Sequence, residues 1–226
     1  ETEIPTNHGK MEDLPKINDD QYIKDWERKH NTNTIKVLDG FKISSNYVFR
    51  RLVVDNYKDD PQDFVNRLYD YRLNDSYKFD LKEPGGTSSS IKQPRSKYDL
   101  ASTAIGYSIM ETPLNMVMFY NAVANNGKMV APRLVERIER DKKIVAQNPV
   151  KVLNPQICTP QTLALVREYM EQVALTGTAK NYFSEEQTTF RVGAKTGTAT
   201  SAKGVGYGEG YHLGSMVTYL PADNPQ

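Results

Sequence analysis

The sequence predicts an α+β domain in which helices pack against an antiparallel sheet, and three observations support this class. Two helix starts, Thr112-Pro113 and Thr159-Pro160, combine a hydroxyl N-cap with proline at the first helical position. Apolar residues then recur at three- and four-residue spacing. Near the end of the chain, two β-capable segments, residues 190–200 and 213–220, flank a glycine-rich loop and predict a hairpin. Helices followed by a terminal hairpin are typical of this class.

The first half of the chain predicts further helices. Residues 1–34 are polar and irregular, apart from a short helix at about residues 21–29. Apolar positions in residues 35–54 suit two helices joined by the polar segment Ser44-Ser45-Asn46. Asp60-Pro61 begins another helix. Glycines, prolines and a serine run predict that residues 74–98 form a loop.

The second half of the chain predicts two hairpins. Residues 134–138 and 143–146 form a short one that turns at Asp141-Lys142. The glycines at 204, 206, 208 and 210 fit no phosphate-binding pattern, so they predict a flexible loop in the terminal hairpin. Because a sheet of two strands is marginal in water, we expect further strands outside these residues.

The composition excludes several classes of function. The chain has 226 residues, 25% of them charged, a formal net charge of +1 and no long basic run, which gives no indication of nucleic-acid binding. No apolar run approaches the roughly 18 to 20 residues that span a bilayer, and no signal peptide opens the chain. A single cysteine, Cys158, excludes an internal disulfide, and the three histidines have no ligand spacing. We therefore expect no metal and no cofactor.

The first motif with chemical meaning is Lys195-Thr196-Gly197-Thr198, preceded by Gly193. Glycine inside a strand marks a place where another backbone or a ligand comes close. A strand with one cation, two hydroxyls and bare backbone could pair with an extended peptide and hold its carboxylate. An ordinary edge strand is the alternative. The similar run Leu175-Thr176-Gly177-Thr178 has leucine in place of the lysine, and we interpret it as a decoy.

The second motif is Ser44-Ser45-Asn46, which precedes the lysine motif in the chain. A serine hydroxyl can relay a proton between a lysine amine and a leaving nitrogen. An asparagine amide both donates and accepts, so it can hold a peptide carbonyl. A polar joint between two helices is the alternative interpretation.

A third motif, Ser-x-x-Lys, occurs only at Ser89-Ser90-Ile91-Lys92. A serine nucleophile needs its lysine one helical turn away on a rigid scaffold. Because Pro84-Gly85-Gly86 and Pro94 flank this run, a stable helix is not expected there. We interpret the match as a coincidence.

The chain from about Ile35 to its end resembles the transpeptidase domain of class B penicillin-binding proteins, most of all the division-type (septal) enzymes. Several segments in the same order support the likeness. They are Ile105-Gly106-Tyr107, Thr112-Pro113-Leu114-Asn115, residues 120–132, Gly177-Thr178-Ala179-Lys180-Asn181, residues 192–199 and Leu220-Pro221-Ala222-Asp223-Asn224-Pro225. The resemblance implies an incomplete penicillin-binding/serine β-lactamase-like domain.

The resemblance also implies roles for single residues. Ser44 would be the relay hydroxyl, and Asn46 would contact the substrate carbonyl. Lys195, Thr196 and Thr198 would bind the carboxylate of the substrate or of a β-lactam, with Gly197 leaving room for it. The backbone N–H of Thr198 would be half of an oxyanion hole.

The same resemblance predicts the context of the chain. Residues 1–226 would be an internal fragment that lacks the Ser-x-x-Lys nucleophile segment before them and the last strand and helix after them, so the fragment itself would be inactive. The parent would be a serine-type D,D-transpeptidase of the bacterial cell envelope, anchored in the inner membrane with this domain outside the cytoplasm. Its partners would be the D-Ala-D-Ala stem peptide, β-lactam antibiotics and membrane proteins of the division machinery, with no nucleic acid.

Three alternatives remain open. The chain could belong to a β-lactam-sensing or binding module, to a serine β-lactamase on the same fold, or to a protein that serves only as a partner surface. Glu111-Thr112-Pro113-Leu114-Asn115 superficially resembles the loop that carries the deacylating glutamate of class A β-lactamases. Since Thr112-Pro113 begins a helix here, we expect Glu111 to be structural.

Overall fold

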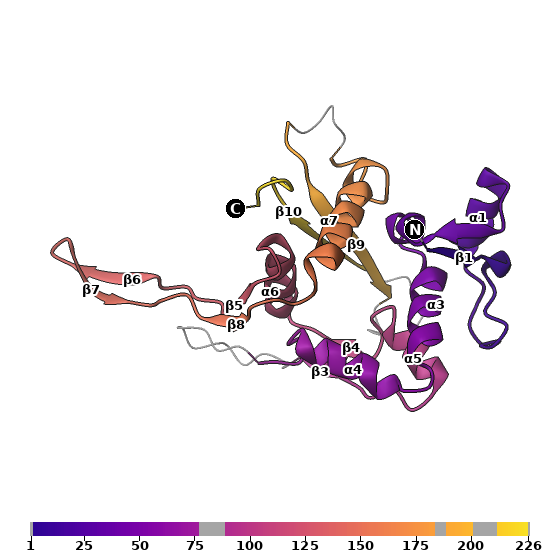
Figure 1. The fold of residues 1–226 in the computed structure, drawn as a ribbon, viewed down its shortest axis with the longest axis horizontal. Coiled ribbons are helices and arrows are strands. Elements are labelled where there is room, and N and C mark those ends of the chain that lie inside the picture. Colours follow the sequence, from indigo (N-terminus) through magenta and orange to yellow (C-terminus); the bar gives the residue numbers. More distant parts are fainter. Residues whose placement is uncertain (1, 77–88, 184–188, 201–211, 226) are drawn as a thin grey trace.

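The computed structural model describes residues 2–76, 89–183, 189–200 and 212–225, and it confirms a mixed arrangement of helices and short antiparallel strands (Figure 1). The N-terminal elements are β1 (Glu3–Pro5), the 3-10 helix η1 (Asn7–Gly9), α1 (Gln21–His30), β2 (Thr34–Lys36), α2 (Val37–Lys42), α3 (Asn46–Tyr57) and α4 (Pro61–Asp70). The middle elements are β3 (Ser90–Ile91), α5 (Lys97–Thr103), β4 (Ile109–Met110), α6 (Pro113–Ala124) and β5 (Met129–Val130). The last elements are β6 (Arg137–Arg140), β7 (Lys143–Gln147), β8 (Val152–Asn154), α7 (Pro160–Leu175), β9 (Gly193–Thr200) and β10 (His212–Tyr219).

The two marked helix starts are confirmed. Thr112 caps α6 by accepting a hydrogen bond from the Asn115 amide, and Thr159 caps α7 by accepting one from Thr162. Each side-chain oxygen satisfies one of the backbone donors that a helix N-terminus leaves without a partner. The predicted helices at about residues 21–29 and after Asp60 are confirmed as α1 and α4.

The strands form five antiparallel pairs among the described residues. The pairs are β1 with β2, β3 with β4, β5 with β8, β6 with β7, and β9 with β10. The β6–β7 hairpin turns at Asp141-Lys142 as predicted, with a positive φ at both residues. Figure 1 shows this hairpin extending away from the body of the molecule. The glycine-rich loop predicted between β9 and β10 lies outside the described residues.

Three sequence-based boundaries were wrong. The first strand of the short hairpin was predicted at residues 134–138, and it is Arg137–Arg140. The stretch from Ile35 was assigned to helices from its apolar spacing, but Ile35 itself lies in β2, opposite Ile4 of β1, and α2 begins only at Val37. Ile35 is buried there in a core that joins the N-terminal segment to α3, a long-range contact that local periodicity does not report. The predicted loop over residues 74–98 contains β3 and the start of α5, while its residues 77–88 lie outside the described part.

The helix α7 organises the last part of the chain. It crosses β9 in Figure 1, and its buried face packs against Ala194 of that strand. The small side chains at Ala174 and Ala179 let the strand approach the helix closely. A second core of apolar residues joins α6, α7 and β10 through Met118, Met170 and neighbouring residues. Strand β9 is therefore fixed between its partner strand and a helix.

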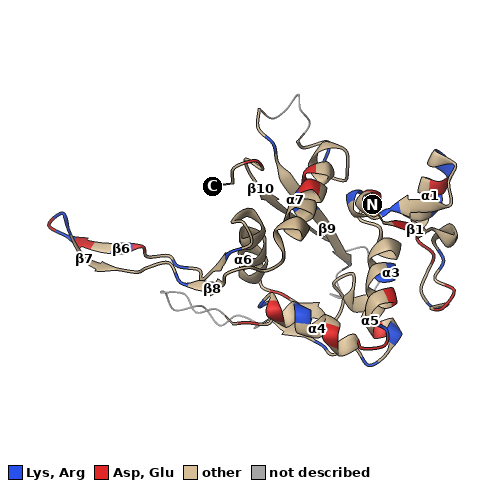
Figure 2. Ribbon diagram, in the orientation of Figure 1, with Lys and Arg blue, Asp and Glu red and all other residues tan. Residues whose placement is uncertain are grey.

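Figure 2 shows charges of both signs mixed along α1, α4 and α7, whereas α6 carries none. Among the described residues, no helix has both the length and the apolar character needed to cross a membrane. In the same part of the chain, no group of three or more His, Cys, Asp or Glu side chains is placed to hold a metal ion.

Candidate active site

The lysine motif and the serine motif meet at one place. Lys195 lies on β9, opposite Val217 of β10, and its ammonium donates hydrogen bonds to the Ser44 hydroxyl and to the Thr196 carbonyl, the latter at 2.8 Å. The structure therefore brings two of the predicted catalytic residues into direct contact.

Ser44 owes its position to the way in which α2 ends. The Ser45 amide donates to the Gly40 carbonyl at 2.9 Å, and the Ser44 amide donates to the Phe41 carbonyl at 3.2 Å. These two bonds form a Schellman motif, which requires a left-handed residue after the helix, usually glycine. Ser44 occupies that position with a φ of 56°. A serine in this conformation is uncommon, and such strain is found preferentially at functional sites.

The chain is held on the far side of Ser44 by a buried carboxylate. Ser45 caps α3 and donates its hydroxyl proton to Asp20 at 2.9 Å, while the Tyr47 amide donates to the same Asp20 oxygen at 2.8 Å. Asp20 also caps α1 through the Tyr22 amide. One carboxylate thus fixes the start of two helices, and the joint between α2 and α3 has little freedom to move.

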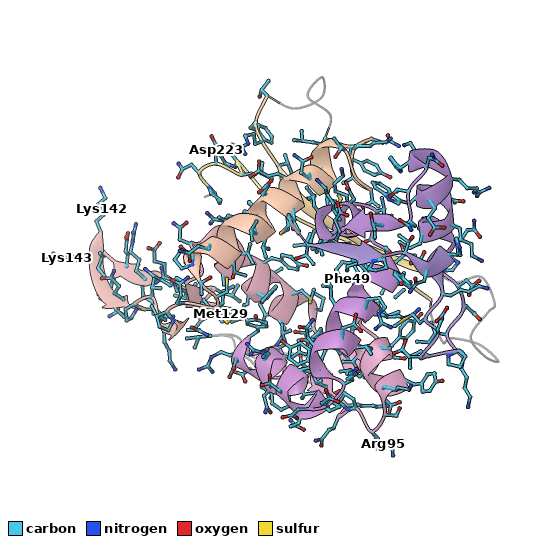
Figure 3. The ribbon with its side chains drawn as sticks, turned by 45° about the vertical axis from the view of Figure 1, so that its right-hand side comes forward. Phe49, Arg95, Met129, Lys142, Lys143 and Asp223 are labelled. Carbon is cyan, nitrogen blue, oxygen red and sulfur yellow. The ribbon has the colours of Figure 1, made fainter. Side chains whose placement is uncertain are left out.

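Lys195 lies in an environment that disfavours its charge. Burial lowers the pKa of Lys195 to about 8. The ammonium lies 5.6 Å from the ring centroid of Phe41 and 6.0 Å from that of Phe49, and Phe49 appears near the centre of the view in Figure 3. The aromatic faces offset part of the lost hydration through cation–π attraction. Among the described residues, no carboxylate pairs with Lys195, so a ligand carboxylate could take that place.

The predicted carboxylate-binding residues share the same strand. Side chains alternate along a strand, so Thr196 and Thr198 project to one face of β9, and Lys195 to the other. A carboxylate that contacts both sets must lie along the edge of β9 away from β10, where no other strand pairs among the described residues. Gly197 lies opposite Ser215, and a Cβ at Gly197 would approach the Ser215 hydroxyl to 2.7 Å.

Asn46 is not brought to this contact. It is the first residue of α3, its side chain is exposed, and it forms no hydrogen bond with Ser44 or Lys195 in the described structure. The role predicted for Asn46 therefore stays a prediction.

The Ser-x-x-Lys run does not form a nucleophile helix. Its central residues, Ser90 and Ile91, form the strand β3, and the Lys92 amide donates to the Ser108 carbonyl at 3.0 Å. Because a strand rather than a helical turn separates Ser89 from Lys92, the two residues lack the one-turn spacing that a serine–lysine pair on a helix has. The expected absence of a helix is seen here, and the interpretation of the match as a coincidence stays a prediction.

Glu111 precedes the N-cap of α6, as expected, but its carboxyl group is buried. Burial raises the pKa of Glu111 to about 7, and the Ser89 hydroxyl offsets this only in part. Neither carboxyl oxygen has a hydrogen bond of ordinary geometry among the described residues. No hydrogen bond joins Glu111 to Ser44 or Lys195 in that part of the chain, so the residue has no visible place in this site.

The chain also matches a known protein family along almost its whole length. The model of the penicillin-binding protein transpeptidase domain matches residues 4–226. The chain belongs to this family. The resemblance to class B penicillin-binding proteins that the sequence predicts is thereby confirmed, together with the fold class.

Relatives of this transpeptidase-family chain carry consistent names. It is 32% identical over 126 residues to stage V sporulation protein D of Bacillus subtilis, which covers 55% of this chain and 19% of that protein. It is 24% identical over 230 residues to a peptidoglycan D,D-transpeptidase FtsI homolog of Mesostigma viride, which covers 92% of this chain and 37% of that protein. The chain thus spans about a fifth to two fifths of the length of these relatives.

Solved structures show the same fold. The D,D-transpeptidase domain of a peptidoglycan glycosyltransferase from Eggerthella lenta has a TM-score of 0.74 at 22% identity, covering 99% of this chain and 52% of that one. Penicillin-binding protein A of Mycobacterium tuberculosis, in a ceftriaxone acyl-enzyme complex, has a TM-score of 0.72 at 19% identity, covering 86% of this chain and 42% of that one.

Three residues around the family's lysine motif could not be picked out from the sequence by the patterns considered above. Phe41 and Phe49 looked like ordinary core residues at helical spacing, and only their position beside Lys195 distinguishes them. Thr178, in the run interpreted as a decoy, lies with its hydroxyl 2.6 Å from that of Thr196. One sequence signal did point to Thr178. It lies in the segment after α7 that contributed to the family resemblance, although no residue of that segment was given a role.

Proposed function

We propose that this chain forms the carboxylate-binding half of a peptidoglycan D,D-transpeptidase site that cross-links stem peptides during septal cell wall synthesis. The contact between Lys195 and Ser44 carries the proposal, because it joins the two motifs that this chemistry needs. The names of the relatives support the reaction class. The names FtsI and stage V sporulation protein D support a role in division-type synthesis.

The reaction has two steps. A serine hydroxyl attacks the carbonyl of the penultimate D-alanine, the peptide bond breaks, and the terminal D-alanine leaves with a proton on its nitrogen. An amine of a second stem peptide then attacks the acyl-enzyme, forms the new peptide bond and returns the serine hydroxyl. Ser44, held by Lys195, relays the proton to the leaving nitrogen. Lys195, Thr196 and Thr198 hold the terminal carboxylate of the substrate. The carboxylate of a β-lactam binds to the same three residues.

The nucleophile is proposed to lie outside these 226 residues, because their only Ser-x-x-Lys run forms an extended strand. The parent protein is proposed to be anchored in the inner membrane, with this domain outside the cytoplasm and with membrane proteins of the division machinery as partners. A β-lactam sensor and a serine β-lactamase are the competing functions on this fold.

A labelling experiment on the parent protein and on this chain tests the proposal. The parent is expected to form a stable adduct with a fluorescent penicillin and to cross-link stem peptides, and Lys195→Ala is expected to abolish both. The 226-residue chain is expected to form no adduct by mass spectrometry. A stable adduct without cross-linking would indicate a sensor, release of the adduct within seconds would indicate a β-lactamase, and a covalent adduct on Ser89 would contradict the proposed place of the nucleophile.

A further inference from the structure

Thr178 connects the two motif segments, although the sequence analysis assigned it no role of its own. Its backbone amide donates to the carbonyl of Lys42 at 3.2 Å, two residues before Ser44. Its hydroxyl lies 2.6 Å from the hydroxyl of Thr196 on β9. The residue therefore contacts the serine side of the site with its backbone and the lysine side with its side chain.

The segment around Thr178 is fixed in place. A Cβ on Gly177 would lie 2.8 Å from the Lys42 carbonyl oxygen and 2.8 Å from the Cα of Val173, so only glycine allows this close approach. The Ala179 amide donates to the Val173 carbonyl at 3.1 Å, and the Ala179 side chain is fully buried between α7 and β9. Thr178 is thus held between two anchored neighbours, while its own side chain is exposed.

Either hydroxyl of the Thr178–Thr196 pair can donate to the other, and one of the two arrangements suits an anionic ligand. Each threonine hydroxyl has one proton to donate and two lone pairs to accept. When the Thr178 hydroxyl donates to the Thr196 oxygen, the proton of Thr196 is free to point along the face of β9 that Thr196 shares with Thr198. An anion bound on this face of β9 would then accept a hydrogen bond from a Thr196 hydroxyl whose orientation is already fixed.

We infer that Thr178 is a positioning residue, which orients the Thr196 hydroxyl toward the carboxylate of a bound stem peptide or β-lactam. The inference rests on the proposed function, because it needs a carboxylate ligand on β9. It assigns Thr178 no contact with the reacting atoms. Removing the Thr178 hydroxyl should therefore weaken initial binding of the ligand and leave the chemical step nearly unchanged.

The test measures acylation of the full-length parent protein by a fluorescent penicillin at several concentrations, which separates the initial dissociation constant from the limiting acylation rate. Thr178→Val is expected to raise the dissociation constant about tenfold, as for a lost hydrogen bond to a charged group, and to change the limiting rate less than about twofold. Thr178→Ser, which keeps the hydroxyl, is expected to restore the wild-type constant. Thr176→Val is the matched control, because among the described residues the Thr176 hydroxyl bonds only to Gln172, within its own helix turn.

A ligand without the charge gives a second readout. The methyl ester of the same penicillin lacks the carboxylate, so Thr178→Val should make no further difference to its binding. The positioning role would be overturned if Thr178→Val weakened binding of the acid and of the ester equally. It would also be overturned if the dissociation constant of the acid did not change. Neither result would contradict the proposed function. A wild-type parent protein that forms no adduct at all would refute both. Thermal unfolding of each variant shows whether a loss comes from the fold.

Discussion

The Lys195 ammonium donates a hydrogen bond to the Ser44 hydroxyl, although 151 positions separate the two residues in the sequence. The contact depends on three features: a left-handed residue at the end of α2, a strand held between β10 and α7, and a lysine buried against two phenylalanine rings. Each feature has a consequence that can be measured.

The left-handed conformation of Ser44 predicts a separation of stability from function. Ser44→Gly should be as stable as the wild type or more stable by up to about 1 kcal/mol, because glycine adopts positive φ without strain. Ser44→Ala should be less stable than Ser44→Gly by about 1 kcal/mol, since alanine keeps the strained Cβ. Urea unfolding of this chain measures both values. Both variants should abolish cross-linking by the parent protein, and an active Ser44→Gly protein would contradict the relay role.

The buried position of Lys195 predicts a pH limit for ligand binding. The pKa of Lys195 is about 8, so the ammonium is largely present at pH 7 and is lost as the pH rises through about 8. Affinity for an N-acetylated peptide that ends in D-alanyl-D-alanine should fall between pH 7 and pH 9.5, as measured by calorimetry or NMR titration. A bound carboxylate raises the pKa of Lys195 in the complex, so the fall in affinity begins near pH 8 and continues up to the pKa of the complex. Lys195→Gln should bind about tenfold more weakly at pH 7 and show no such pH dependence, and a flat wild-type curve would contradict the assignment.

The buried carboxyl of Glu111 predicts that stability falls as the pH rises. The folded-state pKa is about 7 against an ordinary value of 4.5, so the folded protein holds this proton when the unfolded chain has lost it. Stability should therefore decrease from about pH 4.5 to about pH 7 and level off above that. A shift of this size corresponds to about 3 kcal/mol for a group cut off from water, and we expect about 1 to 2 kcal/mol because the side chain is only partly buried.

Glu111→Gln isolates this effect, since it removes the titration with little change in shape. The variant should match the wild type at pH 4 and be the more stable protein at pH 8, as followed by urea unfolding at both values. A wild type that is equally or more stable than Glu111→Gln at pH 8 would show that the carboxylate has found a partner in the folded protein.

The close contact between Gly193 and Tyr219 predicts an intolerance to any side chain at the start of β9. A Cβ on Gly193 would lie 2.3 Å from Cζ of Tyr219, the residue opposite it on β10. The Tyr219 side chain is buried, so its ring has little room to move away. Gly193→Ala should destabilise the chain by about 1 to 3 kcal/mol, as for other overpacked cores.

Gly214→Ala is the control, because a Cβ at Gly214 on the neighbouring strand β10 would meet nothing within 4 Å. This variant should differ from the wild type by less than about 0.5 kcal/mol in urea unfolding. Equal effects of the two substitutions would show that the loss comes from the strand backbone and not from the Tyr219 contact.

Local signals in the sequence were enough to determine the helix starts, one complete hairpin and the identity of the family. Thr112, Thr159 and Asp60 cap helices by accepting from amides three positions away, and Asp141-Lys142 turns a hairpin between adjacent strands. These interactions involve neighbours in the chain, so residue type and spacing reveal them. The two motif segments could be recognised for the same reason.

Only the tertiary structure decided which of the predicted residues meet. It placed Ser44 against Lys195 and Thr178 against Thr196, left Asn46 exposed, and paired Ile35 with Ile4 in a strand where the sequence predicted a helix. It also buried Glu111, which by its sequence position was an ordinary residue before a helix cap. These contacts and this burial depend on how elements that are distant in the chain pack together and exclude water. The spacing of residues along one segment does not report that packing.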